Sequence, residues 1–292
     1  MESFRSGDVA IVGRPNAGKS TLFNALVGER LAIVTPKPQT TRIPLLGVVT
    51  RPASQVVLWD TPGLLDPKYR LQEVMRSHAA RRIREADAVV GLLDAHALDL
   101  DEDLRAVLSG VKVPLIVALN KIDLVPAEQV TLCVARVQEE IRADEVLPIS
   151  ALTGDGLAGL MDALERRLPF GPRLYPDETL TDQPERFFVA ELIREAVFDL
   201  LREEVPYATA VTVEEFRERD AKTYIRANVC VERESQKGIV IGAQGRMLKR
   251  VGSEARRRIE AFLERPVYLD LWVKVREDWR KKDGDLRDFG YV

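Results

Sequence analysis

A glycine-rich stretch near the start of the chain, Gly13–Ser20, has residue types and a spacing suited to holding phosphate groups. Its sequence GRPNAGKS matches the pattern G-x-x-x-x-G-K-[ST], in which glycines let backbone N–H groups turn toward a chain of phosphates. The amine of Lys19 would reach the β- and γ-phosphates, and the hydroxyl of Ser20 would bind Mg²⁺. An apolar run at Val9–Val12 and a helical pattern at Lys19–Val27 supply the flanking strand and helix that this chemistry needs.

A second set of candidate phosphate contacts, Asp60–Gly63, follows an apolar strand pattern. A carboxylate at the carboxyl end of a parallel strand points toward the crevice in which ligands of doubly wound folds bind. Asp60 can therefore hold Mg²⁺ through a water molecule, and the N–H group of Gly63 can contact a γ-phosphate. One threonine of the preceding polar loop should bind Mg²⁺ when the γ-phosphate is present and release it after hydrolysis. We predict Thr41 for this role, with Thr40 as the alternative.

The tetrad Asn120–Asp123 indicates which base the site reads. The carboxylate of Asp123 can accept hydrogen bonds from N1–H and the 2-amino group of guanine, whereas adenine lacks both donors. Sites built on such buried hydrogen bonds reject the analogue that lacks them by a factor on the order of 10⁴–10⁵. The side chain of Asn120 would tether the base site to the phosphate loop, the stem of Lys121 would cover the base, and backbone N–H groups of Ser150–Leu152 would contact guanine O6. An ATP-dependent kinase is therefore disfavoured.

These motifs together define a predicted GTP site. The predicted nucleotide-binding residues are Asn16, Ala17, Gly18, Lys19, Ser20, Thr21, Asp60, Thr61, Pro62, Gly63, Asn120, Lys121, Asp123, Ser150, Ala151 and Leu152. The predicted Mg²⁺ contacts are Ser20, Thr41 and Asp60, and the predicted catalytic residues are Lys19, Thr41 and Gly63. Ras-like enzymes have a water-orienting glutamine directly after D-x-x-G. Leu64 occupies that position here and can neither donate nor accept a hydrogen bond, so we expect slow intrinsic hydrolysis.

The elements that would position this site alternate between strand and helix, which predicts a doubly wound, mostly parallel α/β sheet. The strand-like runs are Val9–Val12, Val56–Trp59, Val89–Leu93, Leu115–Leu119 and Val146–Ile149. The helical patterns are Lys19–Val27, Leu71–Ala86, Ala127–Arg142 and Gly159–Leu168. We assign residues 1–170 to this domain, the proline-rich residues 171–184 to a linker, and residues 185–292 to a smaller α+β domain with a C-terminal tail.

Length and composition agree with two globular domains. The chain has 292 residues, of which 46% are hydrophobic and 30% charged, so a disordered or fibrous protein is excluded. No apolar run approaches the roughly 20 residues of a membrane-spanning helix, and the start shows no signal-peptide pattern. The two cysteines, Cys133 and Cys230, fall in different domains and suggest neither a disulfide framework nor a zinc site. We therefore expect a cytoplasmic protein.

The second domain reads as α-β-β-α-β. Its expected elements include a helix at Glu185–Glu204, a strand at Thr223–Glu232, a helix at Arg246–Arg265 and a strand at Val267–Val275. A G-x-x-G sequence, Gly242–Gly245, is expected to follow a strand and to open the basic helix. The same pattern at residues 156–159 lacks the basic context and carries no such interpretation.

The helix after the G-x-x-G sequence is strongly basic in a chain whose net charge is −3. Its seven basic residues exceed its three acidic residues by four, which gives the helix a formal charge of +4 and points to a polyanionic partner. The predicted RNA contacts are Gly242, Ala243, Gln244, Gly245, Arg246, Lys249 and Arg250.

These motifs resemble known families along essentially the whole chain. Residues 8–168 resemble the translation-factor-type branch of P-loop GTPases, and the second domain resembles a type II KH domain, whose G-x-x-G loop clamps about four single-stranded nucleotides. A GTPase followed by a KH domain, with Thr181–Phe187 between them and Phe289–Val292 at the end, resembles the bacterial Era family. The resemblance implies GTP/GDP and Mg²⁺ as cofactors, binding to the 3′ end of 16S rRNA, and a role with the 30S subunit. It also implies that Asn16 can help to coordinate K⁺.

Three accounts of the function remain open from the sequence. In the first, the nucleotide state gates RNA binding by a monomer. In the second, the protein binds RNA constitutively and its GTPase domain is nearly inactive. In the third, the basic helix attaches a GTPase peripherally to the inner face of the cell membrane, although the helix lacks the exposed Trp or Phe that such helices usually carry.

Overall fold

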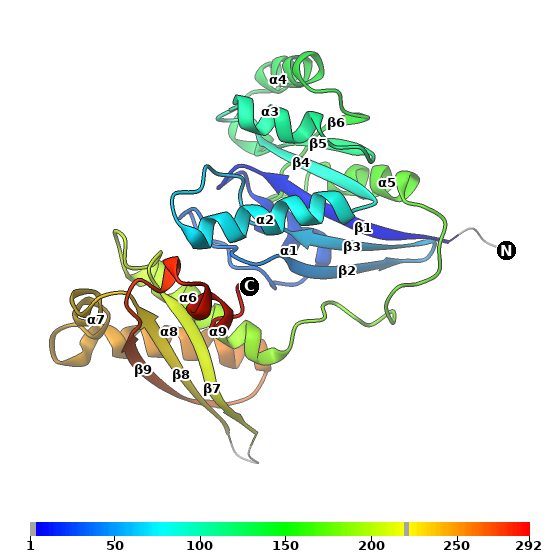
Figure 1. Cartoon of the computed structure of the whole chain (residues 1–292). Coiled ribbons are helices and arrows are strands. Elements are labelled where there is room, and N and C mark those ends of the chain that lie inside the picture. Colours follow the sequence, from blue (N-terminus) through cyan, green and yellow to red (C-terminus); the bar gives the residue numbers. More distant parts are fainter. Residues whose placement is uncertain (1–3, 219–221) are drawn as a thin grey trace. The chain divides into compact units, whose positions relative to one another are not determined.

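The computed structural model describes residues 4–218 and 222–292, and the chain divides into two compact units that consist mainly of residues up to Asp182 and from Gln183 onward (Figure 1). Each unit has its own sheet and its own apolar core. No helix within the described ranges is long and apolar enough to cross a membrane.

The first unit is built around a six-stranded sheet with strand order β2-β3-β1-β4-β5-β6. The strands are β1 (Arg5–Gly13), β2 (Leu45–Arg51), β3 (Ser54–Asp60), β4 (Ala88–Asp94), β5 (Leu115–Asn120) and β6 (Glu145–Pro148). The helices are α1 (Lys19–Val27), α2 (Arg70–Glu85), α3 (Glu102–Ser109), α4 (Ala127–Glu140) and α5 (Leu157–Arg167), with a 3₁₀ turn at Ile122–Leu124. Only the pair β2–β3 is antiparallel among the strand pairs of this described sheet. The predicted mostly parallel α/β fold is confirmed.

The central strands contain apolar runs, such as Val9–Val12 in β1 and Leu115–Leu119 in β5, because helices cover both faces of the sheet (Figure 1). Every residue of β5 is buried, the carboxyl-terminal half of β1 is buried, and every residue of β3 except the half-buried Trp59 is buried as well. The parallel strands β1, β3 and β5 end at the same edge of the sheet, and each of the three predicted motifs begins with the last residue of one of them. The fold therefore brings the motifs to one rim.

The segment expected as a linker is largely held against the first sheet. The buried side chain of Gln55 accepts hydrogen bonds from the backbone N–H groups of Leu174 and Tyr175, at 2.7 and 2.9 Å, and donates one to the carbonyl of Tyr175 at 2.9 Å. Farther along, the carbonyl of Leu180 accepts a hydrogen bond from Val48 on the edge strand β2 at 2.8 Å. This extended segment covers an edge that would otherwise present unpaired backbone groups.

The second unit has a three-stranded sheet, in the order β7-β8-β9, whose core packs against helices. Its elements are α6 (Glu185–Leu200), β7 (Ala210–Arg217), β8 (Thr223–Val231), α7 (Glu234–Ile241), a 3₁₀ turn (Ala243–Gly245), α8 (Arg246–Leu263), β9 (Val267–Val275), a 3₁₀ turn (Trp279–Lys281) and α9 (Asp283–Asp288). The inward-facing residues Val251, Ala255 and Ile259 of α8 are fully buried, as the amphipathic pattern predicts.

One expectation for this unit is wrong. The residues before the G-x-x-G sequence form helix α7, not a strand. The side chain of Gln236 caps this helix by accepting hydrogen bonds from the N–H groups of Glu232 and Arg233, at 3.0 and 3.2 Å. Buried Val240 anchors the helix in the core. The element order is therefore α-β-β-α-α-β, because capping and packing outweigh the β-branched character of Ile239–Ile241.

Candidate nucleotide site and nucleic-acid interface

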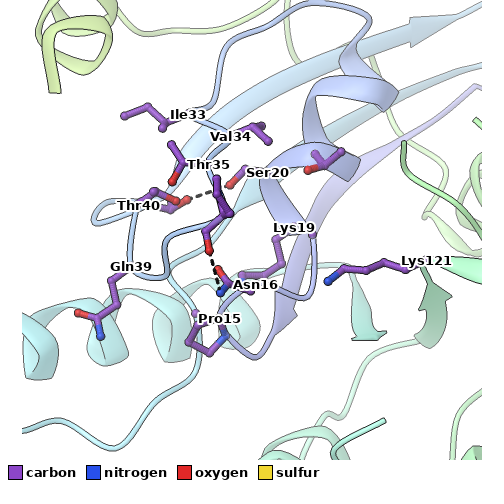
Figure 2. A pocket seen from close by; sticks show the side chains of 15 residues that line it. Pro15, Asn16, Lys19, Ser20, Ile33, Val34, Thr35, Gln39, Thr40 and Lys121 are labelled. Carbon is purple, nitrogen blue, oxygen red and sulfur yellow. Dashed lines mark hydrogen bonds between the residues drawn. The ribbon is translucent and has the colours of Figure 1, made fainter. Parts of the chain in front are cut away.

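The predicted phosphate loop joins β1 to α1 and lines a pocket of about 460 Å³ (Figure 2). Gly18 adopts a φ of 99°, a left-handed conformation that favours glycine, and it immediately precedes the first residue of α1. The buried amine of Lys19 donates hydrogen bonds to the carbonyls of Gly13 and Arg14, at 3.1 and 2.8 Å. The loop thus curls around the lysine and presents its backbone to the pocket.

The three predicted Mg²⁺ contacts converge beside this loop. The hydroxyl of Ser20 lies 3.0 Å from the Thr41 hydroxyl and donates to the Asp60 carboxylate at 2.8 Å. The Thr41 hydroxyl also donates to Asp60, at 3.0 Å. The other oxygen of Asp60, Oδ1, is buried and has no hydrogen-bond partner among the described residues. A cluster of hard oxygen atoms with one unsatisfied carboxylate oxygen suits a magnesium ion and its waters.

Burial shifts the pKa values of Lys19 and Asp60 in opposite directions. It lowers the pKa of Lys19 to about 8, and the nearby carboxylate of Asp60 opposes that shift. It raises the pKa of Asp60, while the ammonium of Lys19 and the hydroxyl hydrogen bonds oppose the rise. Desolvation thus disfavours charge on both groups, and a bound cation and polyphosphate would favour it.

Asn16 and the loop that carries Thr41 face each other across the pocket (Figure 2). The side-chain amide of Asn16 donates a hydrogen bond to the carbonyl of Pro36 at 3.2 Å. Asn16 itself has a positive φ of 63°, and its side chain extends toward that loop (Figure 2). The Asn16 side chain is therefore hydrogen-bonded to the loop that carries Thr41 at the rim of the pocket.

The residues after Asp60 lie close to the phosphate loop. A Cβ atom at Gly63 would be 2.9 Å from the backbone nitrogen of Pro15, so only glycine fits there. The N–H group of Leu64 donates to the carbonyl of Gly13 at 3.0 Å, and the Leu64 side chain is 3% exposed within the apolar core. That side chain faces away from the pocket.

Sequence reasoning did not single out the contacts of Arg14. Its guanidinium donates to the carbonyl of Leu64 at 3.1 Å and forms an ion pair with Asp101. The ion pair joins residues far apart in the sequence, and the sequence carries no signal for it.

The predicted base-reading residues are held by hydrogen bonds, with Asn120 and Ser150 buried and Asp123 exposed. The side-chain amide of Asn120 donates to the carbonyl of Ala17 at 2.8 Å, and its oxygen accepts from the N–H group of Ala151 at 2.9 Å. The hydroxyl of Ser150 donates to the Asp123 carboxylate at 2.6 Å. The Asp123 carboxylate is thereby oriented by a side chain of the loop after β6, as a guanine-reading carboxylate requires.

Lys121 reaches this region with a positive φ of 66°, and its side chain extends toward the pocket (Figure 2). Its amine forms an ion pair with Asp94 at 2.5 Å. Asp94 stands at the carboxyl end of β4, so its position follows from the parallel topology, although no motif identifies it.

The remaining predicted residues differ in their placement. Thr21 lines the pocket. Thr61 donates its hydroxyl to the carbonyl of Ile11 at 2.7 Å and is fully buried, and Pro62 beside it is buried as well. Leu152 is exposed. Thr61 therefore fixes the loop against β1, and its hydroxyl is already used within the protein.

In the second unit, the G-x-x-G sequence makes a tight turn between α7 and α8. Gly242 has a φ of 69°, and a Cβ atom there would lie 2.7 Å from the Cβ of Met247, so this turn requires glycine. Gly245 is also left-handed, with a φ of 76°, and immediately precedes α8. The turn therefore places backbone groups at the amino-terminal end of the basic helix, where an anion is favoured.

A groove of about 380 Å³ continues from this turn along α8 and β9. Its lining residues are Gly245, Leu248, Lys249, Gly252, Ser253, Arg256, Leu269 and Leu271. On another side of α8, a hollow of about 750 Å³ is lined by Asp199, Leu200, Arg246, Lys249, Arg250, Ser253, Glu254, Arg257 and Arg258. Of the predicted RNA contacts, Gly245 lines the groove, Arg246 and Arg250 line the other hollow, and Lys249 lines both.

Part of the positive charge of α8 is neutralised within the protein. Arg257 pairs with Glu254 at 2.6 Å, and hydrogen bonds from Arg257 and Arg258 lower the pKa of Glu254 to about 2. Arg258 also pairs with Asp199 at 2.7 Å. Lys249, Arg250 and Arg256 form no ion pair within residues 4–218 and 222–292, so the charge available to a partner includes these positions along the helix.

Two family models match the chain and agree with this division. Residues 8–121 match the family described as 50S ribosome-binding GTPase, and residues 204–280 match the KH domain family. The second match includes the G-x-x-G turn, the groove and the basic helix.

Proteins named GTPase Era match along nearly the whole chain. The Halothermothrix orenii protein is 45% identical over 292 residues, covering 99% of each chain, and the Geobacter metallireducens protein is 45% identical over 293 residues, covering 99% of this chain and 98% of its own. A crystal structure of Era in complex with MgGDPNP and nucleotides 1506–1542 of 16S ribosomal RNA has a TM-score of 0.94 at 39% identity, with 99% of both chains covered. A variant of Aquifex aeolicus Era bound to GDP and AlF₄⁻ has a TM-score of 0.94 at 38% identity, covering 99% of this chain and 100% of that chain.

Proposed function

The chain belongs to the Era family of GTPases, and we propose that it is a nucleotide-gated RNA-binding protein of ribosome assembly. In this proposal it hydrolyses GTP with Mg²⁺ in its first unit and binds the single-stranded 3′ end of 16S rRNA through its KH domain. It would act as a cytoplasmic monomer in the maturation of the 30S subunit. The observation that carries the GTPase assignment is the convergence of Ser20, Thr41 and Asp60 within 3.0 Å of one another.

The proposed division of labour in hydrolysis follows from the geometry of the first unit. Lys19, curled inside the phosphate loop, would bind the β- and γ-phosphates once its contacts with Gly13 and Arg14 open. Mg²⁺, which Ser20 and Thr41 would bind directly and Asp60 through water, supplies positive charge that stabilises the negative charge of the transferring phosphoryl group. Gly63 would donate its N–H group to the γ-phosphate, so that the loops of Thr41 and Gly63 both respond to it.

The proposed intrinsic rate of GTP hydrolysis is slow because the side chain of Leu64 cannot orient the attacking water molecule. Its side chain is buried in the core, and its backbone N–H group already donates a hydrogen bond to the carbonyl of Gly13. A second cation could supply part of the missing electrostatic stabilisation. We propose that the side-chain oxygen of Asn16 and the carbonyl oxygen of Pro36 contribute ligands to a potassium ion at the pocket rim. The Asn16 side-chain nitrogen already donates a hydrogen bond to that carbonyl at 3.2 Å, which holds the two residues next to each other.

The potassium proposal is tested by measuring single-turnover GTP hydrolysis in matched KCl and NaCl buffers. We expect faster hydrolysis in KCl, and Asn16→Ala should remove the difference while retaining Mg²⁺-dependent GTP binding. Equal rates in the two salts, or a potassium effect that survives in Asn16→Ala, would show that this site binds no functional K⁺.

RNA binding is proposed to occur at the turn of Gly242 and the groove along α8. The turn offers backbone groups and a helix amino terminus to a phosphate, and the unpaired cations of α8 supply positive charge next to it. The apolar wall formed by Leu269 and Leu271 suits the face of a base. This combination is typical of single-stranded nucleic acid binding.

The deciding experiment measures GTP hydrolysis and RNA affinity together. The RNA is a single strand with the sequence of the 3′ end of 16S rRNA, and affinity is measured with GDP, with a non-hydrolysable GTP analogue and without nucleotide. We expect RNA to stimulate hydrolysis and to bind most tightly in the GTP-analogue state. Gly242→Asp should abolish both effects, because a side chain at this left-handed position collides with Met247 and adds negative charge.

The other accounts predict different results. A constitutive RNA-binding protein would bind RNA equally in all three nucleotide states and would not be stimulated by it. A membrane-surface GTPase would be stimulated by vesicles that contain anionic lipids and not by RNA. Lys249→Ala, a change on an exposed helix surface, separates loss of charge from any disturbance of the turn in Gly242→Asp.

A further inference from the structure

Gly252 occupies a position in the longest helix of the second unit where another residue would favour helix formation more. It lies inside α8, Arg246–Leu263, and lines the groove rather than the core. Glycine in a helix interior destabilises the helix relative to alanine, because the unfolded chain loses more conformational freedom on folding. The presence of glycine at a position where it destabilises the helix therefore requires an explanation.

The fold itself does not supply that explanation. A Cβ atom at Gly252 would lie 3.5 Å from Cδ1 of Leu271, which is an ordinary van der Waals distance. The backbone there is regular α-helix, without the positive φ that makes glycine necessary at Gly242. Alanine would therefore fit at position 252, and its methyl group would project into the groove toward the Leu271 wall.

The groove beside Gly252 has the composition of a nucleotide site. Lys249, Ser253 and Arg256 lie on the same side of α8, because residues three and four apart in a helix are neighbours. Lys249 and Arg256 are seven residues apart, which separates them by roughly 10 Å along the helix axis. Both are exposed and form no ion pair in the described part of the chain. Two cations thus flank the bare stretch of helix backbone at Gly252.

We infer that the absence of a side chain at Gly252 leaves space for one base or sugar of a single-stranded RNA to bind in the groove, and that Arg256 binds a phosphate of the same RNA strand. This inference rests on the proposed RNA-binding function and assigns Gly252 and Arg256 to it. The strand would begin at the Gly242–Gly245 turn, pass Lys249, place one nucleotide between the helix and Leu271, and leave past Arg256. The absence of a side chain at position 252 then determines how closely RNA can approach α8.

The test uses the full-length protein and separates stability from binding. Gly252→Ala and Gly252→Leu are compared with Gly238→Ala, the same change in helix α7, where a Cβ would meet no heavy atom of the described chain within 4 Å. Thermal melting gives the Tm, and fluorescence anisotropy with a labelled single strand of the 16S rRNA 3′ end gives the Kd.

We expect both alanine variants to raise the Tm of the unit by about 2–5 °C. Gly252→Leu should weaken RNA binding on the order of tenfold or more, Gly252→Ala should weaken it less, and Gly238→Ala should leave it unchanged. Gly252→Leu with unchanged RNA affinity would overturn the inference. A lower Tm for Gly252→Ala would also overturn it, because the glycine would then serve the fold. If the unaltered protein fails to bind the RNA, the proposed function itself fails, which is a distinct outcome.

The role of Arg256 is tested by salt dependence. Arg256→Ala should weaken RNA binding and reduce the slope of log Kd against log salt concentration by about one, because one phosphate contact is lost. Arg257→Ala removes a neighbouring guanidinium that is already paired with Glu254 and should change the slope less. Equal effects of the two variants would show that α8 contributes only diffuse charge and that Arg256 makes no defined contact.

Discussion

The side-chain amide of Asn120 donates a hydrogen bond to the carbonyl of Ala17 over 2.8 Å, and this bond ties the end of β5 to the phosphate loop. The same side chain accepts a hydrogen bond from Ala151 at 2.9 Å. Asn120 therefore joins three segments that each carry a different part of the nucleotide site. Its orientation couples the base-reading residues to the phosphate-binding residues.

Replacing Asn120 with alanine should weaken both stability and nucleotide binding. The Ala17 carbonyl and the Ala151 N–H group would be left buried without partners, which costs about 1–3 kcal/mol for each group. Denaturant unfolding should report the loss of stability, and titration with a fluorescent GDP analogue should report a fall in affinity. Thr131→Ala removes only an exposed hydrogen bond to Ala127 and should change stability by less than about 0.5 kcal/mol. Similar losses in the two variants would contradict the bridging role.

Replacing Asp123 with asparagine should change the base that is read. The carboxylate accepts hydrogen bonds from guanine, whereas an asparagine amide can donate one to the C2 carbonyl of xanthine. GTP affinity should fall by at least about 100-fold and XTP affinity should rise. Competition binding with the two nucleotides provides the measurement. Asp155→Asn makes the same change at a nearby exposed carboxylate and should leave both affinities unchanged. A parallel fall for GTP and XTP in Asp123→Asn would refute direct base reading.

The first domain could be predicted well because its motifs and its fold impose the same constraint. Gly18, Lys19 and Ser20 require a strand before them and a helix after them, and Asp60 and Asn120 are the last residues of β3 and β5. Local sequence, strand order and chemistry therefore agree at each motif. Contacts such as Arg14 with Asp101 depend on which side chains meet in three dimensions, and nothing in the local sequence specifies them.

The second domain was harder to predict because charge along a helix does not show which cations remain available. The formal excess counted over the predicted helix, Arg246–Arg265, includes Arg257, Arg258 and Arg265, all of which form ion pairs with acidic residues. Arg256 differs from its neighbour only in the direction of its side chain, and that direction depends on how α8 packs. The helical conformation of residues 234–241 likewise depends on the cap at Gln236, which no periodicity reveals.

Restoring a glutamine at position 64 should not create a fast GTPase. The Leu64 side chain is buried in the core, so Leu64→Gln places an amide in an apolar site and should lower the free energy of unfolding by about 1–3 kcal/mol. Single-turnover hydrolysis should rise less than about threefold, because the side chain faces away from the phosphates. Leu64→Met conserves volume and should cost less than about 1.5 kcal/mol. A large gain in rate at unchanged stability would mean that the loop readily turns residue 64 toward the nucleotide.

Nucleotide affinity should depend on pH through Lys19, whose pKa burial lowers from 10.5 to about 8. As the pH rises through 8, a growing fraction of the free protein carries a neutral Lys19, whereas bound phosphates favour the charged form. Binding at pH 8.5 should therefore take up protons, and apparent GTP affinity should decline as the pH increases above about 8. The free energy of unfolding should change in the opposite direction. Between pH 8 and 10.5 the unfolded chain binds more protons at Lys19 than the folded chain, so the contribution of this group to the free energy of unfolding rises with pH in that window.

Isothermal titration in two buffers with different ionisation enthalpies would measure the proton uptake directly. Lys19→Arg retains a positive charge at every pH in the range and shares all other ionisations of the protein and the nucleotide, so it is the matched control. The unaltered protein should show a buffer-dependent binding enthalpy at pH 8.5 that is much smaller at pH 6.5, and Lys19→Arg should show none of this difference. If both proteins gave the same pH profile, the proton would belong to another group, and the buried lysine would be charged before the nucleotide binds.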